Sequence, residues 1–149
     1  MRVRLPLYST VVITLCVLSA CKPAQTQSLV KAVKEVKVTV TCSATSDSVW
    51  VKVDPWTAGV ERNTDLEWDL TAASTADTMT VTAKSPGNWP YDDAPPYGAK
   101  KGGKKAKASK MKSGAPNGVP YGYNIEVTCR NGAGPSHKLV IDPELIIVN

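Results

Sequence analysis

Apolar and polar residues alternate along most of the chain after residue 34. In residues 36–42, VKVTVTC, three valines and Cys42 occupy every second position, with lysine or threonine between them. A period of two places the apolar side chains on one face of a β-strand and the polar side chains on the other. This segment therefore predicts a half-buried strand with Cys42 on its inner face.

Similar short segments follow at close spacing, separated by turn residues. They cover residues 49–53, 57–61, 65–71, 78–84, 121–129, 137–141 and 145–148. None is long enough for a helix with a repeated apolar face. Seven or eight short strands separated by turns predict an all-β fold, an antiparallel β-sandwich.

Two residues interrupt this pattern. Trp50 lies out of phase with Val49 and Val51, so we expect it either to be exposed or, by preference, to pack beneath the long segment 85–120. Pro143 separates the last two apolar runs, which predicts a kink or a switch of strand followed by a final edge strand.

The first 20 residues, MRVRLPLYSTVVITLCVLSA, have a different character. Arg2 and Arg4 precede an apolar run over residues 11–18 that is too short to span a bilayer. A basic start followed by such a run is typical of a signal peptide. The sequence thus predicts an exported protein whose residues 1–20 are removed.

The end of this signal, Leu18-Ser19-Ala20-Cys21, resembles the lipobox of bacterial lipoproteins. The resemblance implies lipidation of Cys21 and attachment of the mature chain to the cell envelope by acyl chains. Lys22 stands where an aspartate favours inner-membrane retention, so the resemblance implies the outer membrane. Cleavage without lipidation is the alternative.

The mature chain of 129 residues is long enough for one domain with a core. We expect residues 21–34 to form a tether and residues 35–149 to form the domain. Without Arg2 and Arg4 the chain has 16 basic and 13 acidic residues, and seven of the lysines lie in one run. The remainder of the mature chain is therefore net acidic.

Two cysteines besides Cys21 remain after the signal is removed. Cys129 shares one face of the segment 121–129 with two tyrosines, an isoleucine and a valine, so Cys42 and Cys129 both point inward. Exported chains meet an oxidising compartment, where such a pair favours a disulfide. Two free buried thiols are the alternative.

Residues 85–120 lack the strand pattern and contain six of the eleven prolines and six of the ten glycines. Three aromatic residues in 88–97 predict an ordered flap, whereas 99–118 contain little to bury and predict a mobile loop. Within this insertion the run KKGGKKAKASKMK concentrates basic charge. Its seven lysines are the candidate anion-binding residues: Lys100, Lys101, Lys104, Lys105, Lys107, Lys110 and Lys112.

The segment from Val60 to Trp68 and the late segment YGYNIEVTC resemble the cupredoxin layout, in which such strands precede the copper-ligand loop. The resemblance implies a cupredoxin-like sandwich, although an immunoglobulin-like sandwich has a similar alternation. The copper ligands do not carry over. A blue-copper site needs two histidines, a cysteine and usually a methionine, but His137 is the only histidine and no methionine follows it. We therefore expect no metal and no cofactor.

Catalytic arrangements are not expected either. Ser136 and His137 are adjacent and leave a strand on opposite faces, so they cannot pair as nucleophile and base. Glu67 and Asp69 share a face, but Leu66 and Trp68 alternate with them, which places that face in solvent. The sequence thus predicts a non-enzymatic protein.

Three functions fit these observations. The first is an envelope binding module whose lysines bind anionic lipid, lipopolysaccharide or acidic glycan, while export argues against nucleic acid. The second is a metal-carrying or electron-carrying protein of cupredoxin type. The third is a structural envelope component whose lysines are only solvated.

Overall fold

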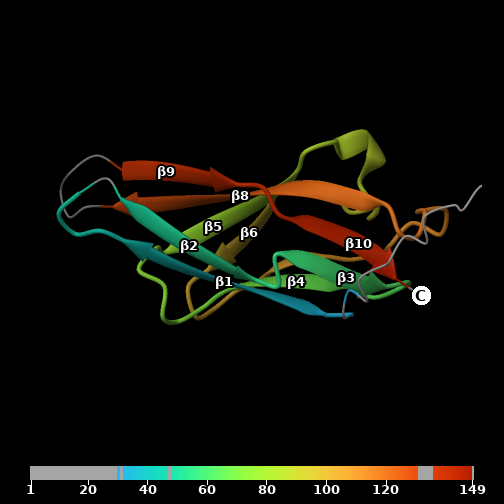
Figure 1. Cartoon of the computed structure of the whole chain (residues 1–149), viewed down its shortest axis with the longest axis horizontal. Coiled ribbons are helices and arrows are strands. Elements are labelled where there is room, and N and C mark those ends of the chain that lie inside the picture. The colour runs from blue at the N-terminus through green and yellow to red at the C-terminus, as the bar shows by residue number, and fades with distance from the viewer. Residues whose placement is uncertain (1–29, 31, 47, 131–135, 149) are drawn as a thin grey trace, which may run out of the picture.

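The computed structural model describes residues 30, 32–46, 48–130 and 136–148. The expected signal peptide, Cys21 and most of the expected tether lie outside these residues. Within them the chain forms ten strands and one short 3-10 helix (Figure 1). These elements are β1 (Glu35–Cys42), β2 (Val49–Asp54), β3 (Thr57–Glu61), β4 (Leu66–Leu70), β5 (Thr78–Ala83), η1 (Pro86–Asn88), β6 (Tyr97–Lys100), β7 (Ala106–Ala108), β8 (Pro120–Arg130), β9 (Ser136–Ile141) and β10 (Glu144–Val148).

The strands form two sheets that pack face to face (Figure 1). One sheet has the order β2-β1-β4-β7. The other has the order β3-β10-β8-β5-β6, and β9 also pairs with β8. The expected all-β sandwich is confirmed, with ten strands rather than seven or eight because the segment 85–120 supplies β6 and β7.

The expectation of a purely antiparallel sandwich is wrong. β1 pairs with β4 in parallel, and β10 pairs with β3 in parallel. The cause lies in the path of the chain. After the β1–β2 hairpin the chain crosses to the other sheet as β3, then returns as β4 on the far side of β1. Alternation of side chains determines which face of a strand is buried, but it does not determine the direction of the neighbouring strand.

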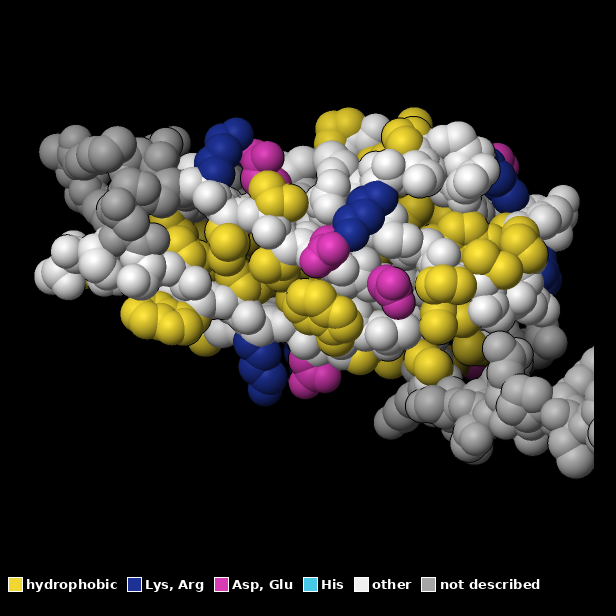
Figure 2. Space-filling model, turned by 45° about the horizontal axis from the view of Figure 1, so that its top comes forward, with side chains coloured by type: hydrophobic (Ala, Val, Ile, Leu, Met, Phe, Trp, Pro, Cys, Tyr) yellow, Lys and Arg dark blue, Asp and Glu magenta, His cyan; other side chains and the backbone are white. Residues whose placement is uncertain are grey.

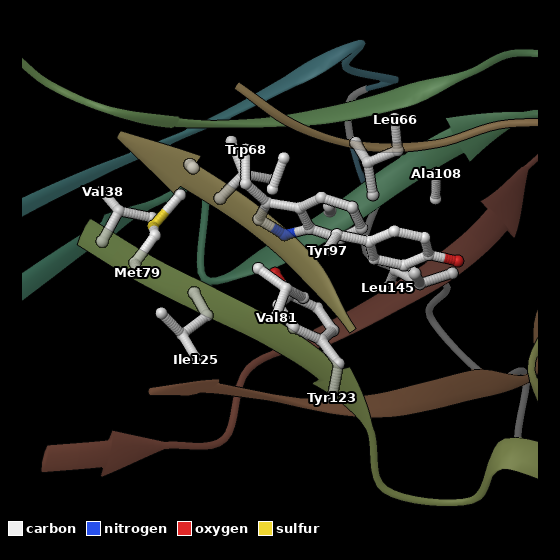
Figure 3. Packing of buried hydrophobic residues seen from close by; sticks show 14 of the residues in the cluster. Val38, Leu66, Trp68, Met79, Val81, Tyr97, Ala108, Tyr123, Ile125 and Leu145 are labelled. Atoms are coloured by element: carbon white, nitrogen blue, oxygen red, sulfur yellow. The ribbon is translucent and has the colours of Figure 1, made fainter. Parts of the chain in front are cut away.

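Aromatic residues fill the centre of the sandwich (Figure 3). Trp68 of β4 stacks on Tyr97 of β6 with ring centroids 5.9 Å apart, and it meets Tyr123 of β8 edge-on at 5.4 Å. Aromatic pairs of this kind contribute about 0.5 to 1.5 kcal/mol beyond their buried area. Residues 88–97, predicted as an ordered flap, thus complete the core, with Trp89 and Tyr91 also buried.

Residues 99–118 also contribute to the core, so the expectation that they have little to bury is wrong. Their buried residues are small or flexible: Ala99, Ala106, Ala108, Met111 and Ala115. The alanines of β6 and β7 alternate with lysine or glycine and belong to the same core cluster as the large aromatic rings. A methyl group fills the space that remains beside such rings, so these edge strands need no large apolar residue.

A disulfide links Cys42 of β1 to Cys129 of β8, with Cα atoms 5.7 Å apart. The predicted pairing of these two inward-facing cysteines is therefore confirmed, and the bridge joins the two sheets. At the opposite end of the sandwich, Arg62 follows β3 and donates to the carbonyl oxygens of Ser113 and Ala115 at 2.8 and 2.7 Å.

Trp50 is 61% exposed, so the expectation that it packs beneath residues 85–120 is wrong. β2 lies at one end of its sheet and β7 at the other, which separates Trp50 from that segment. Pro143 interrupts the last two strands as expected. However, β10 lies between β3 and β8, so the final strand is not an edge strand; β9 has β8 as its only partner among the described strands.

Candidate anion-binding edge

The seven lysines lie along one side of the sandwich. β6 ends one sheet and β7 ends the other, and the chain between residues 100 and 112 follows these two strands. We call this side the lysine edge and define it by Lys100, Lys101, Lys104, Lys105, Lys107, Lys110 and Lys112. The sequence predicted that these residues lie in one mobile loop. In the structure they lie in β6, in β7 and in the segments next to these strands.

Carboxylates neutralise two of the seven lysines. Lys105 Nζ lies 2.6 Å from Glu35 Oε1 and 3.6 Å from Glu67 Oε2. Lys107 Nζ lies 2.8 Å from Asp65 Oδ2 and 3.9 Å from Glu67 Oε1. A hydrogen bond to Glu35 raises the pKa of Lys105, and one to Asp65 raises the pKa of Lys107. These two lysines are already paired and are poor candidates for an external anion.

Sequence reasoning missed the three acidic partners. Glu35 of β1 lies directly beside Glu67 of β4 in the parallel register, and like charges in such a pair repel. Lys105 touches both carboxylates and offsets this repulsion. The sequence did contain a clue, because acidic residues lie on the polar faces of two predicted strands and a basic run follows later. However, only the parallel pairing of β1 and β4 brings Glu35 and Glu67 together beside the lysines.

The other five lysines make no ion pair within the described part of the chain. Three of them, Lys100, Lys101 and Lys104, surround the turn that joins β6 to β7 and are exposed. This turn is held by backbone hydrogen bonds. The Lys100 amide donates to the Lys104 carbonyl at 2.7 Å, and the Lys101 amide donates to the Asp77 carbonyl at 2.9 Å. Among the described residues, three ammonium groups with no ion-pair partner therefore project from an ordered turn.

Gly102 makes the tight path of this turn possible. Its φ of 56° lies in the left-handed region, which glycine adopts without steric strain. Its amide donates to the carbonyl of Leu70, the last residue of β4, at 3.1 Å. Gly102, which lies in the segment predicted to be mobile, is thus part of a defined turn.

Lys110 and Lys112 lie beyond the other end of β7. The Asp92 amide donates to the Lys110 carbonyl at 3.0 Å, and the Lys112 amide donates to the Pro90 carbonyl at 2.8 Å. Nearby, both carboxylate oxygens of Asp93 accept from the Ser109 amide, at 3.0 and 2.9 Å. These contacts fix the backbone that carries the two lysines against the aromatic segment 88–97.

Lys112 also lines a groove of about 540 Å³ between η1 and residues 112–122. The groove is mainly apolar, with Trp89 and Tyr121 among its lining residues, and Lys112 is the one charged residue that lines it within the described chain. Arg62 supports one wall through its bonds to Ser113 and Ala115. A mainly apolar groove therefore lies next to the lysine edge at Lys112.

Residues 71–75, which follow β4, form a hydroxyl network with β1. Ser74 Oγ accepts from the Val40 amide at 3.1 Å, and Thr75 Oγ1 accepts from the Cys42 amide at 2.6 Å. Cys129 is in the disulfide, so it supplies no thiolate. His137 lies opposite Cys129 in the β8–β9 register, but its side chain is outside the described residues. Among described residues, no three potential metal ligands gather.

Of the paired carboxylates considered from the sequence, Glu67 lines an open hollow with Glu35, Asp65 and Lys107, and Asp69 does not line it. Leu66, Trp68 and Leu70 are buried, and Glu67 points to the other face, where Lys105 and Lys107 contact it. Cys21 lies outside the described residues, so the structure leaves the lipidation site a prediction.

No helix within the described ranges is long and apolar enough to cross a membrane. Comparison of the chain with protein-family models, with curated proteins and with solved structures gave no match.

Proposed function

We propose that the mature protein is a non-enzymatic binding module of the bacterial cell envelope, anchored by lipid at Cys21 and binding anionic envelope components through the lysine edge. One observation carries the proposal. Lys100, Lys101 and Lys104 are exposed on an ordered turn, and no carboxylate of the described residues pairs with them.

The electrostatics of this turn favour an anionic ligand. Three like charges held on one turn repel one another, and a bound anion relieves that repulsion. Near an anionic membrane each basic residue contributes about 1 kcal/mol, so three lysines contribute about 3 kcal/mol. This attraction is screened within about 8 Å at physiological salt, which makes binding sensitive to salt. Anionic lipid, lipopolysaccharide and acidic glycan all carry the required charge.

We propose further that the sandwich has a cupredoxin-like rather than an immunoglobulin-like arrangement. The crossing of the chain between β2 and β3 supports it, as does one parallel strand pair in each sheet. We do not extend this proposal to a copper site, because Cys129 is bonded to Cys42 and hydroxyl groups occupy the region 71–75.

A structural role for the lysines is the second candidate. β6 has four residues and β7 has three, and both lie at sheet ends. Short edge strands rich in lysine prevent edge-to-edge association of β-proteins. In this case the lysines keep the protein monomeric at this edge and bind no ligand.

Vesicle sedimentation separates the two candidates. We expect the exported protein with Cys21→Ser to bind anionic vesicles and lipopolysaccharide at low salt, but not zwitterionic vesicles, and to be released as salt rises. Changing Lys100, Lys101 and Lys104 to glutamine should abolish binding without altering the melting temperature.

The matched control removes the same charge elsewhere, by changing the exposed Lys34, Lys37 and Lys84 to glutamine. This control should retain most of the binding. Equal loss in both triple variants would show that only net charge matters. Full binding by the Lys100, Lys101 and Lys104 variant would refute the anion-binding proposal, and aggregation of that variant would favour the structural role.

A further inference from the structure

The side of the sandwich opposite the lysine edge is apolar. Of the four large apolar residues that are exposed in the described chain, three belong to or adjoin β2 and β9: Trp50 at 61%, Val140 at 53% and Trp56 at 49%. Valines 49, 51 and 53 of β2, with Leu139 and Ile141 of β9, pack against the core but remain only partly buried. Figure 2 shows a band of apolar side chains over this part of the molecule. We call β2, Trp56 and β9 the apolar edge.

The backbone of β2 is open on this side. β2 is the end strand of its sheet and pairs only with β1 among the described strands. It has six residues, three of them valine and one tryptophan, and its charged residues are Lys52 and Asp54. A long apolar edge strand is a template for another strand. The lysine edge, by contrast, has short strands with many charges.

We infer that β2 pairs with β2 of a second copy of this chain, antiparallel across a two-fold axis. The charge pattern of the strand selects both the partner and the register. Residues that face one another across two strands must lie on the same face of the sheet. For two identical strands this condition allows registers centred on Trp50, Val51, Lys52 or Val53 when at least three residues pair.

Only one of these registers pairs most of β2 without placing like charges opposite each other. Centring on Trp50 or on Val53 pairs just three residues of β2 with their counterparts. Centring on Lys52 places two ammonium groups opposite each other. Centring on Val51 pairs five residues, puts Trp50 of each copy opposite Lys52 of the other, and puts Val49 opposite Val53 on the inner face. Trp50 and Lys52 are both exposed on the outer face, where a lysine over an indole ring is favourable.

This pairing makes one continuous sheet of eight strands from two four-stranded sheets. It satisfies the open backbone groups of β2 and covers the half-exposed valines of both copies. The interface is isologous, because each copy uses the same strand in the same way. The dimer leaves both lysine edges free, so it does not depend on the proposed anion binding.

Cysteine cross-linking tests the register directly. The full chain is exported with Cys16→Ser and Cys21→Ser, so that an introduced cysteine is the one thiol outside the Cys42–Cys129 disulfide. In the proposed dimer Val51→Cys lies opposite itself, close enough for a disulfide. Val53→Cys, on the same face of the same strand, lies opposite Val49. We expect a cross-linked dimer on mild oxidation for Val51→Cys and none for Val53→Cys. Cross-linking of both variants, or of neither, would overturn the inference.

Sedimentation velocity tests the charge argument with no cross-link. The Cys21→Ser protein should show a concentration-dependent dimer. Lys52→Glu should raise its dissociation constant about tenfold, because both cation–π contacts are lost. Lys37→Glu, the same change on the exposed face of the neighbouring strand β1, should have little effect. A monomer at every concentration, or equal effects of the two substitutions, would refute the inference. Unchanged melting temperatures show that both variants are folded.

Discussion

Removing the disulfide between Cys42 and Cys129 tests how the two sheets are held together. The bridge closes a sequence separation of 87 residues. In the loop-entropy model, a bridge over a loop of this length stabilises the folded state by about 4 to 5 kcal/mol. Cys129 is 1% exposed, so Cys129→Ala also removes buried sulfur, which adds about 1 kcal/mol at most. We expect Cys42→Ala and Cys129→Ala to be nearly equivalent, because the lost cross-link dominates both.

The expected loss is large enough to measure by thermal unfolding. For a domain of this size, 1 kcal/mol shifts the melting temperature by about 4 °C, so each single variant should melt about 15 to 20 °C below the oxidised protein. Circular dichroism of the Cys21→Ser protein gives this value, and reducing agent should lower the wild-type value similarly. The double variant should melt close to the single variants, because the second substitution removes no further bond. Additive losses in the double variant, or two titratable thiols in the folded oxidised protein beyond Cys21 and Cys16, would refute this reasoning.

Three further predictions concern the anchor, alkaline stability and the groove. Cys21→Ser should release the protein from membranes, and wild-type protein should incorporate labelled fatty acid; no incorporation would contradict the anchor. Burial raises the pKa of Tyr97 and of Tyr123 to about 12, above the value near 10 in an unfolded chain. The unfolded state therefore loses these protons first, so stability is complete below pH 10 and falls as pH rises from 10 to 12. Urea unfolding at pH 9 and pH 11 checks this, and equal stabilities would contradict it. Arg62→Ala leaves the Ser113 and Ala115 carbonyls without their donor, so it should destabilise the protein by about 1 to 3 kcal/mol and speed amide exchange in residues 112–118; unchanged exchange would contradict the proposed support of the groove.

The local pattern of the sequence determined eight of the ten strands and their inner faces. Val36, Val38 and Val40 are buried in β1, as are Leu66 and Trp68 in β4, where the alternation placed them. The same parity located Cys42 and Cys129 on inner faces, and the disulfide confirms it. These features follow from the sequence because the pleat of a strand depends only on residues within a few positions of each other.

The partners of each strand were decided only in the tertiary structure. Lys105 meets Glu35 across 70 residues of sequence, and it does so only because β1, β4 and β7 are neighbours in one sheet. Trp50 is exposed because β2 ends that sheet on the side away from residues 85–120. The alanines of β7 are buried because core rings leave space for a methyl group. Alternation predicts whether a side chain points inward or outward. Which residues that side chain contacts depends on how the fold brings distant segments of the chain together.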